Sequence, residues 1–242
     1  MTAEILFPEV CNLYGDLQNI NYLTRSCPEI NVIKTDLQTK PKFLSEDIDL
    51  VYIGSSTEKG LQLAVRALSA YRDEILEKIE KGQLILATGN ALDLFVQYVK
   101  SDDGLYFDGL GIIDAYCDYH MLNRHNSFFL GNFEDADENI KIVGFKSLFG
   151  HVYGNLTEKA LFHTLRGVGR NPNTPLEGIH YNNLLLTHII GPLLILNPPF
   201  TKYILKKMGV AEPTLAFEEA AFDSYNQRIQ EFEQPSRNTI YQ

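Results

Sequence analysis

The stretch Gln83-Leu84-Ile85-Leu86-Ala87-Thr88-Gly89-Asn90-Ala91 decides the fold of this chain. Its apolar first half predicts a buried strand, Thr88-Gly89-Asn90 predicts a tight turn, and the apolar spacing from Ala91 onward predicts a helix. Just upstream, Gly82 is placed to end a preceding helix as its C-terminal cap. A strand that turns tightly into a helix is the repeating unit of parallel sheets covered by helices.

The same alternation of strands and helices extends over the first hundred residues. After residue 109 the pattern changes to short strands separated by turn residues, with an acidic hairpin loop. We therefore predict one α/β domain over residues 1–242, with residues 213–242 as a terminal helix and tail. The predicted strands cover residues 5–7, 30–34, 49–53, 83–87 and 184–189, the predicted helices cover 17–25, 58–81, 198–207 and 213–232, and the predicted loops cover 134–138 and 170–175.

Composition narrows the classes of function. The formal net charge of -10 and a pI near 5.1 make nucleic acid and anionic membrane surfaces unfavourable partners. Three widely spaced cysteines without a CxxC pair indicate a reducing compartment, so we expect a cytoplasmic protein. The longest apolar run, residues 184–196, is interrupted by polar residues and is shorter than the roughly 20 residues of a membrane span. We therefore expect no membrane insertion.

Five groups of residues follow one another along nearly the whole chain: Asn12-Leu13-Tyr14-Gly15-Asp16 with Asn19, Gly109-Leu110-Gly111, Gly144-Phe145, Glu177-Gly178, and Gly191-Pro192-Leu193-Leu194 with Asn197-Pro198. Together they resemble the CobB/CobQ-like (type 1) glutamine amidotransferases and, within that family, the glutaminase subunits of lipid II isoglutaminyl synthases. The resemblance implies a flavodoxin-like class I glutamine amidotransferase fold, with a mostly parallel central sheet flanked by helices and extra antiparallel strands. It also implies a Mur-ligase-like or other ATP-dependent amidoligase subunit as the partner.

Two reactive positions depart from the pattern of that family. The family's nucleophile elbow reads Cys-Gly-Gly-x-Gln, whereas residues 88–92 read Thr-Gly-Asn-Ala-Leu, which places Thr88 at the cysteine position. The family's late His-Gly-Pro motif reads Ile190-Gly191-Pro192. Glutamine hydrolysis needs a thiolate and a base, and a threonine hydroxyl is a far weaker acid than a thiol. We therefore expect no catalytic residues of the family's kind, and a turn at Thr88 that has relaxed.

The turn Gly54-Ser55-Ser56-Thr57 stands where the family has a glycine-rich turn that helps to form the oxyanion pocket. Its N–H groups either bind an anion or simply begin a helix, and we favour the helix cap. Lys146 stands where the family has a glutamate, and it would favour an enzyme only if it lay beside Thr88. The residues that we expect around the former active site are Gly54, Ser55, Ser56, Gly89, Asn90, Lys146 and His188.

His188 and Cys117 each have a reactive and a structural interpretation. His188 reaches the pocket only if its strand bulges, so we favour a core or rim histidine. Cys117 and His120 lie on opposite faces of a predicted strand, which favours an incidental cysteine. The histidines show no metal-ligand spacing, so we expect neither a metal nor a cofactor.

Three hypotheses about function follow from the sequence. The leading one is a pseudoenzyme that keeps the amidotransferase fold in order to bind a partner subunit or a small ligand. The second is an active CobB/CobQ-like amidotransferase subunit that uses an unidentified nucleophile. The third is a stand-alone sensor that binds a metabolite in the cleft without turning it over.

Overall fold

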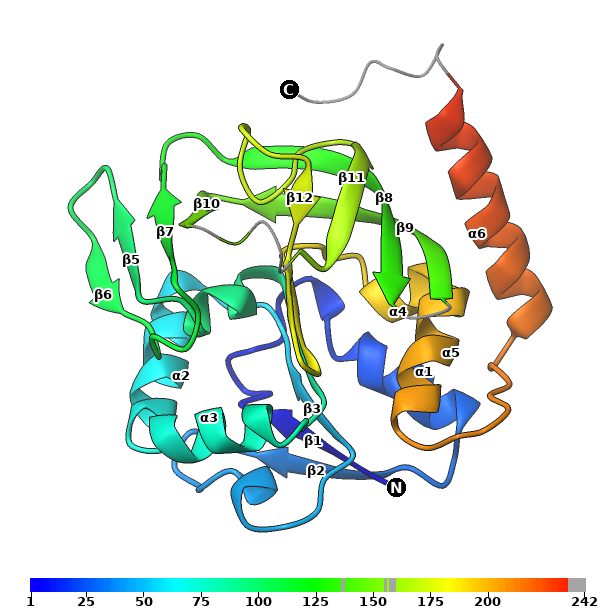
Figure 1. Cartoon of the computed structure of the whole chain (residues 1–242), viewed down its shortest axis with the longest axis horizontal. Coiled ribbons are helices and arrows are strands. Elements are labelled where there is room, and N and C mark those ends of the chain that lie inside the picture. The colour runs from blue at the N-terminus through cyan, green and yellow to red at the C-terminus, as the bar shows by residue number, and fades with distance from the viewer. Residues whose placement is uncertain (136–137, 155, 157–159, 235–242) are drawn as a thin grey trace.

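A six-stranded central sheet organises the chain (Figure 1). The computed structural model describes residues 1–135, 138–154, 156 and 160–234. The strand order is β13-β14-β4-β3-β1-β2, and only β13 runs antiparallel to its neighbour. The predicted α/β class and mostly parallel sheet are confirmed. The strands are β1 (Thr2–Leu6), β2 (Asn31–Thr35), β3 (Leu50–Ile53), β4 (Ile85–Thr88), β13 (Ile179–Tyr181) and β14 (Leu184–Thr187).

Helices cover both faces of this sheet, as a parallel sheet requires. Alternate residues of β3 point to opposite sides: Val51 and Ile53 belong to the core under α2 and α3, while Leu50 and Tyr52 belong to the core under α1 and α5. The α-helices are α1 (Gln18–Ser26), α2 (Glu58–Ser69), α3 (Arg72–Glu80), α4 (Leu193–Leu196), α5 (Pro198–Lys207) and α6 (Glu218–Glu233), and the 3-10 helices are η1 (Leu13–Gly15), η2 (Lys42–Leu44) and η3 (Gly89–Leu94).

The single long helix predicted over residues 58–81 is wrong, because the chain breaks at Tyr71 into α2 and α3. Tyr71 has a non-helical φ of -113° and ψ of 12°. The side chain of Arg72 donates hydrogen bonds to the carbonyls of Leu110 and Gly111, and these distant contacts set the direction of α3. The C-terminal cap is confirmed at Gly82, which has φ +87°.

Two smaller sheets complete the described part of the molecule. The first has the order β10-β7-β5-β6 and the second the order β12-β11-β8-β9. The predicted helix after residue 91 is only the short η3, and the chain then enters β5. The strands are β5 (Tyr98–Ser101), β6 (Tyr106–Asp108), β7 (Ala115–Tyr119), β8 (His125–Asp135), β9 (Glu138–Leu148), β10 (Gly150–Gly154), β11 (Phe162–Arg166) and β12 (Leu176–Glu177).

The terminal helix α6 begins at Glu218, five residues later than predicted, and packs along β9 and α4. The predicted acidic hairpin lies between β8 and β9, but its residues 136–137, like the tail at 235–242, fall outside the described residues. None of the helices in the described residues combines the length and the apolar composition that crossing a membrane requires.

Candidate functional site

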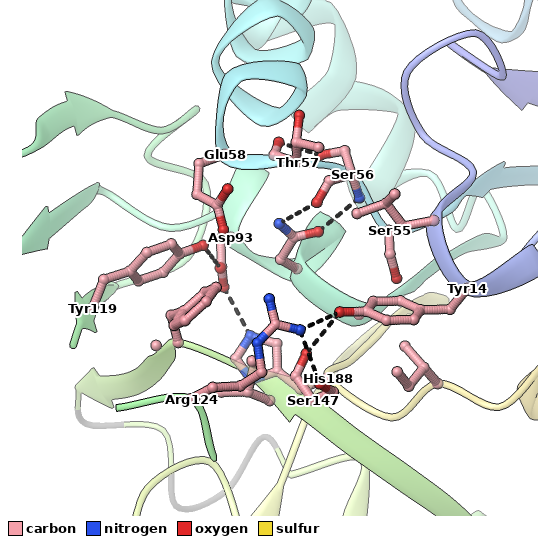
Figure 2. Close-up of a pocket in the computed structure, with 17 residues that line it drawn as sticks. Tyr14, Ser55, Ser56, Thr57, Glu58, Asp93, Tyr119, Arg124, Ser147 and His188 are labelled. Atoms are coloured by element: carbon pink, nitrogen blue, oxygen red, sulfur yellow. Dashed lines mark hydrogen bonds and ion pairs between the residues drawn. The ribbon is translucent and has the colours of Figure 1, made fainter. Parts of the chain in front are cut away.

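A cavity of about 120 Å³ opens at the carboxyl ends of β3, β4 and β14 (Figure 2). This is the edge of a parallel sheet at which α/β proteins ordinarily bind ligands. Its lining includes six positions that the sequence singled out, and three others, Gly54, Thr88 and Lys146, do not line it. The six are Ser55, Ser56, Gly89, Asn90, His188 and Ile190.

The strained turn after β4 falls on Gly89 rather than on Thr88. Thr88 is extended, with φ -115° and ψ 152°, whereas Gly89 has φ +59°. A Cβ atom on Gly89 would overlap the hydroxyl of Ser55 and lie 3.1 Å from Cγ2 of Ile190. The extended backbone of Thr88 agrees with the prediction that the turn at this residue has relaxed, because a threonine avoids positive φ and the adjacent glycine accepts it.

Thr88 belongs to a buried polar network behind the cavity. Its hydroxyl donates to Oδ2 of Asp16 at 2.9 Å and lies 2.8 Å from the hydroxyl of Tyr52. The same Asp16 oxygen accepts hydrogen bonds from the amide and the hydroxyl of Ser55, at 2.8 and 2.7 Å. Burial raises the pKa of Asp16, and these donors oppose the shift. The network joins the loop after β1 to the ends of β3 and β4.

Two amide groups of the turn after β3 are occupied from within the protein. The N–H of Ser55 donates to Asp16, and the N–H of Ser56 donates to Oδ1 of Asn90 at 2.9 Å. The Asn90 amide group donates back to the carbonyl of Ser56 at 2.9 Å. Thr57 is the N-cap of α2, because its hydroxyl accepts from the N–H of Gly60 at 3.1 Å. The helix-cap interpretation of this turn is therefore confirmed.

Gly54 packs against the backbone rather than facing the cavity. A Cβ atom there would lie only 2.7 Å from the carbonyl oxygen of Cys11, so no larger residue fits without a shift.

At the floor of the cavity, Asp93 gathers three donors. It lies 2.8 Å from Nε2 of His188, 2.9 Å from Sγ of Cys117 and 2.5 Å from the hydroxyl of Tyr119. Asp93 and His188 are both almost completely buried. Nε2 of His188 faces this carboxylate, and its Nδ1 has no hydrogen-bond partner among the described residues. His188 is thus a buried histidine that also lines the cavity.

Arg124 and Tyr14 close the opposite side of the cavity, and Figure 2 shows their side chains meeting. The Arg124 guanidinium donates to the hydroxyl of Tyr14 at 2.9 Å and to Oγ of Ser147 at 3.1 Å, and it lies 4.3 Å from the ring centre of Phe149. Tyr14 has φ +58°, an unfavourable backbone conformation for an aromatic residue. Glu58, at the start of α2, brings a second carboxylate to the lining beside Asp93.

Lys146 does not lie beside Thr88. Its ammonium group is buried, 3.2 Å from Oε1 of Glu177 and 2.8 Å from the carbonyl of Gly169. Burial lowers the pKa of Lys146, and the charge of Glu177 opposes that shift. The condition under which this lysine would favour an enzyme is therefore not met.

Several lining residues were missed by the sequence analysis. Tyr14 lies inside a family motif, and Asp93 follows the elbow motif by one residue, so both carried a signal that could have been used. Arg124 carries none, since it comes from an irregular connection between β7 and β8. The missed polar residues are Tyr14, Glu58, Asp93, Tyr119, Arg124 and Ser147.

A mostly parallel sheet covered by helices on both faces is the fold of class I glutamine amidotransferases. Two solved structures share it at low sequence identity. One is described as PurLQS from Thermotoga maritima, with a TM-score of 0.57, 13% identity, and coverage of 94% of this chain and 98% of that chain. The other is described as a glutamine amidotransferase, with a TM-score of 0.55, 14% identity, and coverage of 86% and 99%.

The chain belongs to the CobB/CobQ-like glutamine amidotransferase family, whose domain profile matches residues 3–193. Among its relatives is the GatD subunit of lipid II isoglutaminyl synthase (glutamine-hydrolyzing) from Staphylococcus aureus strain N315. The two sequences are 30% identical over 198 residues, which cover 81% of this chain and 79% of the relative. The family resemblance predicted from the sequence is therefore confirmed.

Proposed function

We propose that this chain is a catalytically degenerate glutamine amidotransferase that acts by binding. The observation that carries the proposal is the pair Gly89 and Ile190. With the register set by the positive φ, the family's Cys-Gly-Gly-x-Gln falls on residues 89–93, and the nucleophile position is Gly89, which has no side chain. The histidine position is Ile190, whose Cγ2 fills the space beside it.

The other groups near the site do not replace the lost chemistry. Burial raises the pKa of the Cys11 thiol to about 12, and it raises the pKa of the Cys117 thiol well above its ordinary value, so neither is a thiolate at neutral pH. Loss of the nucleophile and base of a comparable catalytic triad lowers turnover on the order of 10⁶-fold. Occupied Ser55 and Ser56 amides also leave the turn after β3 without these two donors for an oxyanion.

A partner subunit is the first binding function that we propose. The relative from S. aureus is a subunit of a synthase, and the sequence resembles glutaminase subunits that accompany a Mur-ligase-like subunit. A surface that holds an amidoligase can persist after the active site is lost. All three cysteines are buried and unpaired, as expected for the cytoplasmic location that we predict.

A small zwitterionic ligand is the second candidate, and the charges of the cavity favour it. Glu58 offers a carboxylate on one side of the cavity, and Arg124 offers a guanidinium group on the other. Within the described residues no salt bridge joins Arg124 to a carboxylate, so its charge is available to an anionic group. A sensor that holds an amino-acid-like metabolite would use both sides.

Release of glutamate from glutamine by the purified chain, alone and with a co-expressed Mur-ligase-like subunit, tests the loss of catalysis. We expect no release in either case, together with a complex of the two subunits. Release in either sample would instead favour the active-subunit hypothesis and overturn ours.

Thermal unfolding tests the ligand candidate. Glutamine and related amino acids should raise the melting temperature of the wild-type chain but not that of Arg124→Met. Arg66→Met, on the exposed side of α2, is the matched control and should keep the shift. Equal shifts in all three proteins would exclude Arg124 as a ligand contact.

A further inference from the structure

The small sheet β10-β7-β5-β6 carries one tyrosine from each strand in a continuous row. Tyr98 pairs with Tyr116 on β7, and Tyr116 pairs with Tyr153 on β10. Tyr106 on β6 stacks on Tyr98 from the other side. Successive ring centres are 5.5, 5.2 and 5.6 Å apart, and the ring planes differ by 23°, 10° and 25°. We call these four residues the tyrosine row.

The tyrosine row lies on the outer face of its sheet. Side chains alternate along a strand, and the neighbours Val99, Cys117 and Val152 point inward and are buried. Tyr106 is 61% exposed. Figure 1 shows β5, β6 and β7 at the edge of the molecule. Tyrosine is enriched at protein interfaces because it offers a large apolar area with a polar tip and little conformational freedom to lose.

This face already holds one cation, which shows how a second would be bound. The ammonium group of Lys100 lies 5.2 Å from the ring centre of Tyr116 and 3.3 Å from Oδ2 of Asp118. The Lys100 ammonium group is thus held by an aromatic ring and a carboxylate at the same time. A cation held between a ring and a carboxylate gains from both.

The other end of the row repeats the ring and the carboxylate without the cation. Asp108 is paired with Tyr98 across β5 and β6, and the hydroxyl of Tyr106 lies 3.3 Å from its Oδ1. Among the described residues no lysine or arginine pairs with Asp108. Asp108 and the neighbouring ring of Tyr106 are therefore available to a cation from outside this chain.

We propose that the tyrosine row with Asp108 is the docking surface for the amidoligase subunit, and that an arginine side chain of that subunit occupies the end of the row. Arginine fits better than lysine because a planar guanidinium stacks on a ring while pairing with a carboxylate. The net charge of -10 of this chain adds attraction for a basic surface. The inference rests on the proposed function, since it names the surface through which the partner binds.

The test uses the full chain and a co-expressed Mur-ligase-like subunit from the same organism, with the Kd measured by calorimetry. The double variant Tyr98→Thr/Tyr106→Thr keeps strand-forming residues, and we expect it to weaken binding about 100-fold, as loss of central aromatic contacts does. Asp108→Asn should weaken binding about 10-fold and reduce its dependence on salt. Phe217→Asn, at a 71% exposed aromatic residue near α6, is the matched control and should keep the wild-type Kd.

The outcomes separate the surface from the function. If the wild-type chain forms no complex, both the proposed partner and this docking surface are refuted. If the tyrosine double variant binds with the wild-type Kd, the proposed docking surface is refuted and the proposed partner is not. Melting temperatures within a few degrees of wild type are required of every variant, and single Tyr106→Thr replaces the double variant if it unfolds. Because Tyr106 is at the exposed end of the row, the single variant Tyr106→Thr should still weaken binding about 10-fold.

Discussion

Cγ2 of Ile190 lies 3.1 Å from the place that a Cβ atom on Gly89 would occupy. In the register that we propose, these two positions correspond to the cysteine and the histidine of the family. Here an apolar side chain packs against a residue that has no side chain.

This contact predicts a steric penalty for any side chain at position 89. Gly89→Ala should destabilise the chain more than Gly111→Ala, because both glycines have φ near +60° but only Gly89 has neighbours within 4 Å. The backbone strain of each is about 1–3 kcal/mol. The difference between the two variants in chemical denaturation therefore reports the overlap with Ser55. Adding Ser55→Gly to Gly89→Ala should recover most of this difference in stability. Equal losses of stability in the two alanine variants would contradict the geometry.

The register of the elbow can be tested without any activity. A cysteine at position 89, introduced as Gly89→Cys/Ser55→Gly/Ile190→His, should react with iodoacetamide because Gly89 lines the cavity. Thr88→Cys should resist, because Thr88 is fully buried in the Asp16 network. Mass spectrometry of the native proteins distinguishes the two. Preferential labelling at position 88 would return the elbow to Thr88.

Thr88 should act as a structural residue. Thr88→Val removes the donor to Asp16 and leaves a buried carboxylate less satisfied, which is expected to lower the free energy of unfolding by about 1–3 kcal/mol. Thr88→Ser keeps the hydroxyl and should lower the free energy of unfolding clearly less than Thr88→Val. Urea denaturation of the two variants is the measurement, and a Thr88→Val chain as stable as wild type would show that the network contributes nothing.

The buried pair Lys146 and Glu177 should matter far more than an exposed one. Lys146→Met leaves a buried carboxylate without its cation and should cost about 3–5 kcal/mol. The control Lys202→Met breaks the partly exposed pair with Glu218 and should cost about 1 kcal/mol or less. Similar losses in thermal or urea denaturation would mean that Glu177 is satisfied by its other partners.

Stability should fall in acid because of His151. Burial, followed by the charges of His125, His188 and Lys146, lowers the pKa of His151 from 6.5 to about 4. Below pH 6.5 His151 binds a proton in the unfolded chain but stays neutral in the folded chain. The contribution of His151 to the free energy of unfolding is therefore full above pH 6.5 and is lost as the pH falls toward 4. The loss is on the order of 2 kcal/mol for a partly buried group. His151→Asn should flatten this part of the pH profile of unfolding, and parallel profiles would refute it.

The sequence predicted the sheet well because apolar periodicity records which residues are buried. It predicted strands over residues 49–53, 83–87 and 184–189, which correspond to β3, β4 and β14 with ends that differ by up to two residues, and it predicted the helix at residues 198–207. The break at Tyr71 does not, because it depends on hydrogen bonds from Arg72 to carbonyls about forty residues away. Local pattern carries no information about such contacts.

The site was predicted less completely for two physical reasons. A threonine beside a glycine allows the elbow motif to be placed in two registers, and we propose the one at Gly89 because that residue has the positive φ. Arg124 reaches Tyr14 across 110 positions from a segment without periodicity. Its place at the cavity is a product of the topology, so no local signal could reveal it.

The paired hydrogen bonds between Asn90 and Ser56 join the turn after β4 to the turn after β3. Restoring the family's glycine at position 90 would remove both bonds, and a side chain at position 89 would overlap Ser55. In the register that we propose, repair of the active site therefore competes with the stability of these two turns, so a restored enzyme needs several substitutions made together.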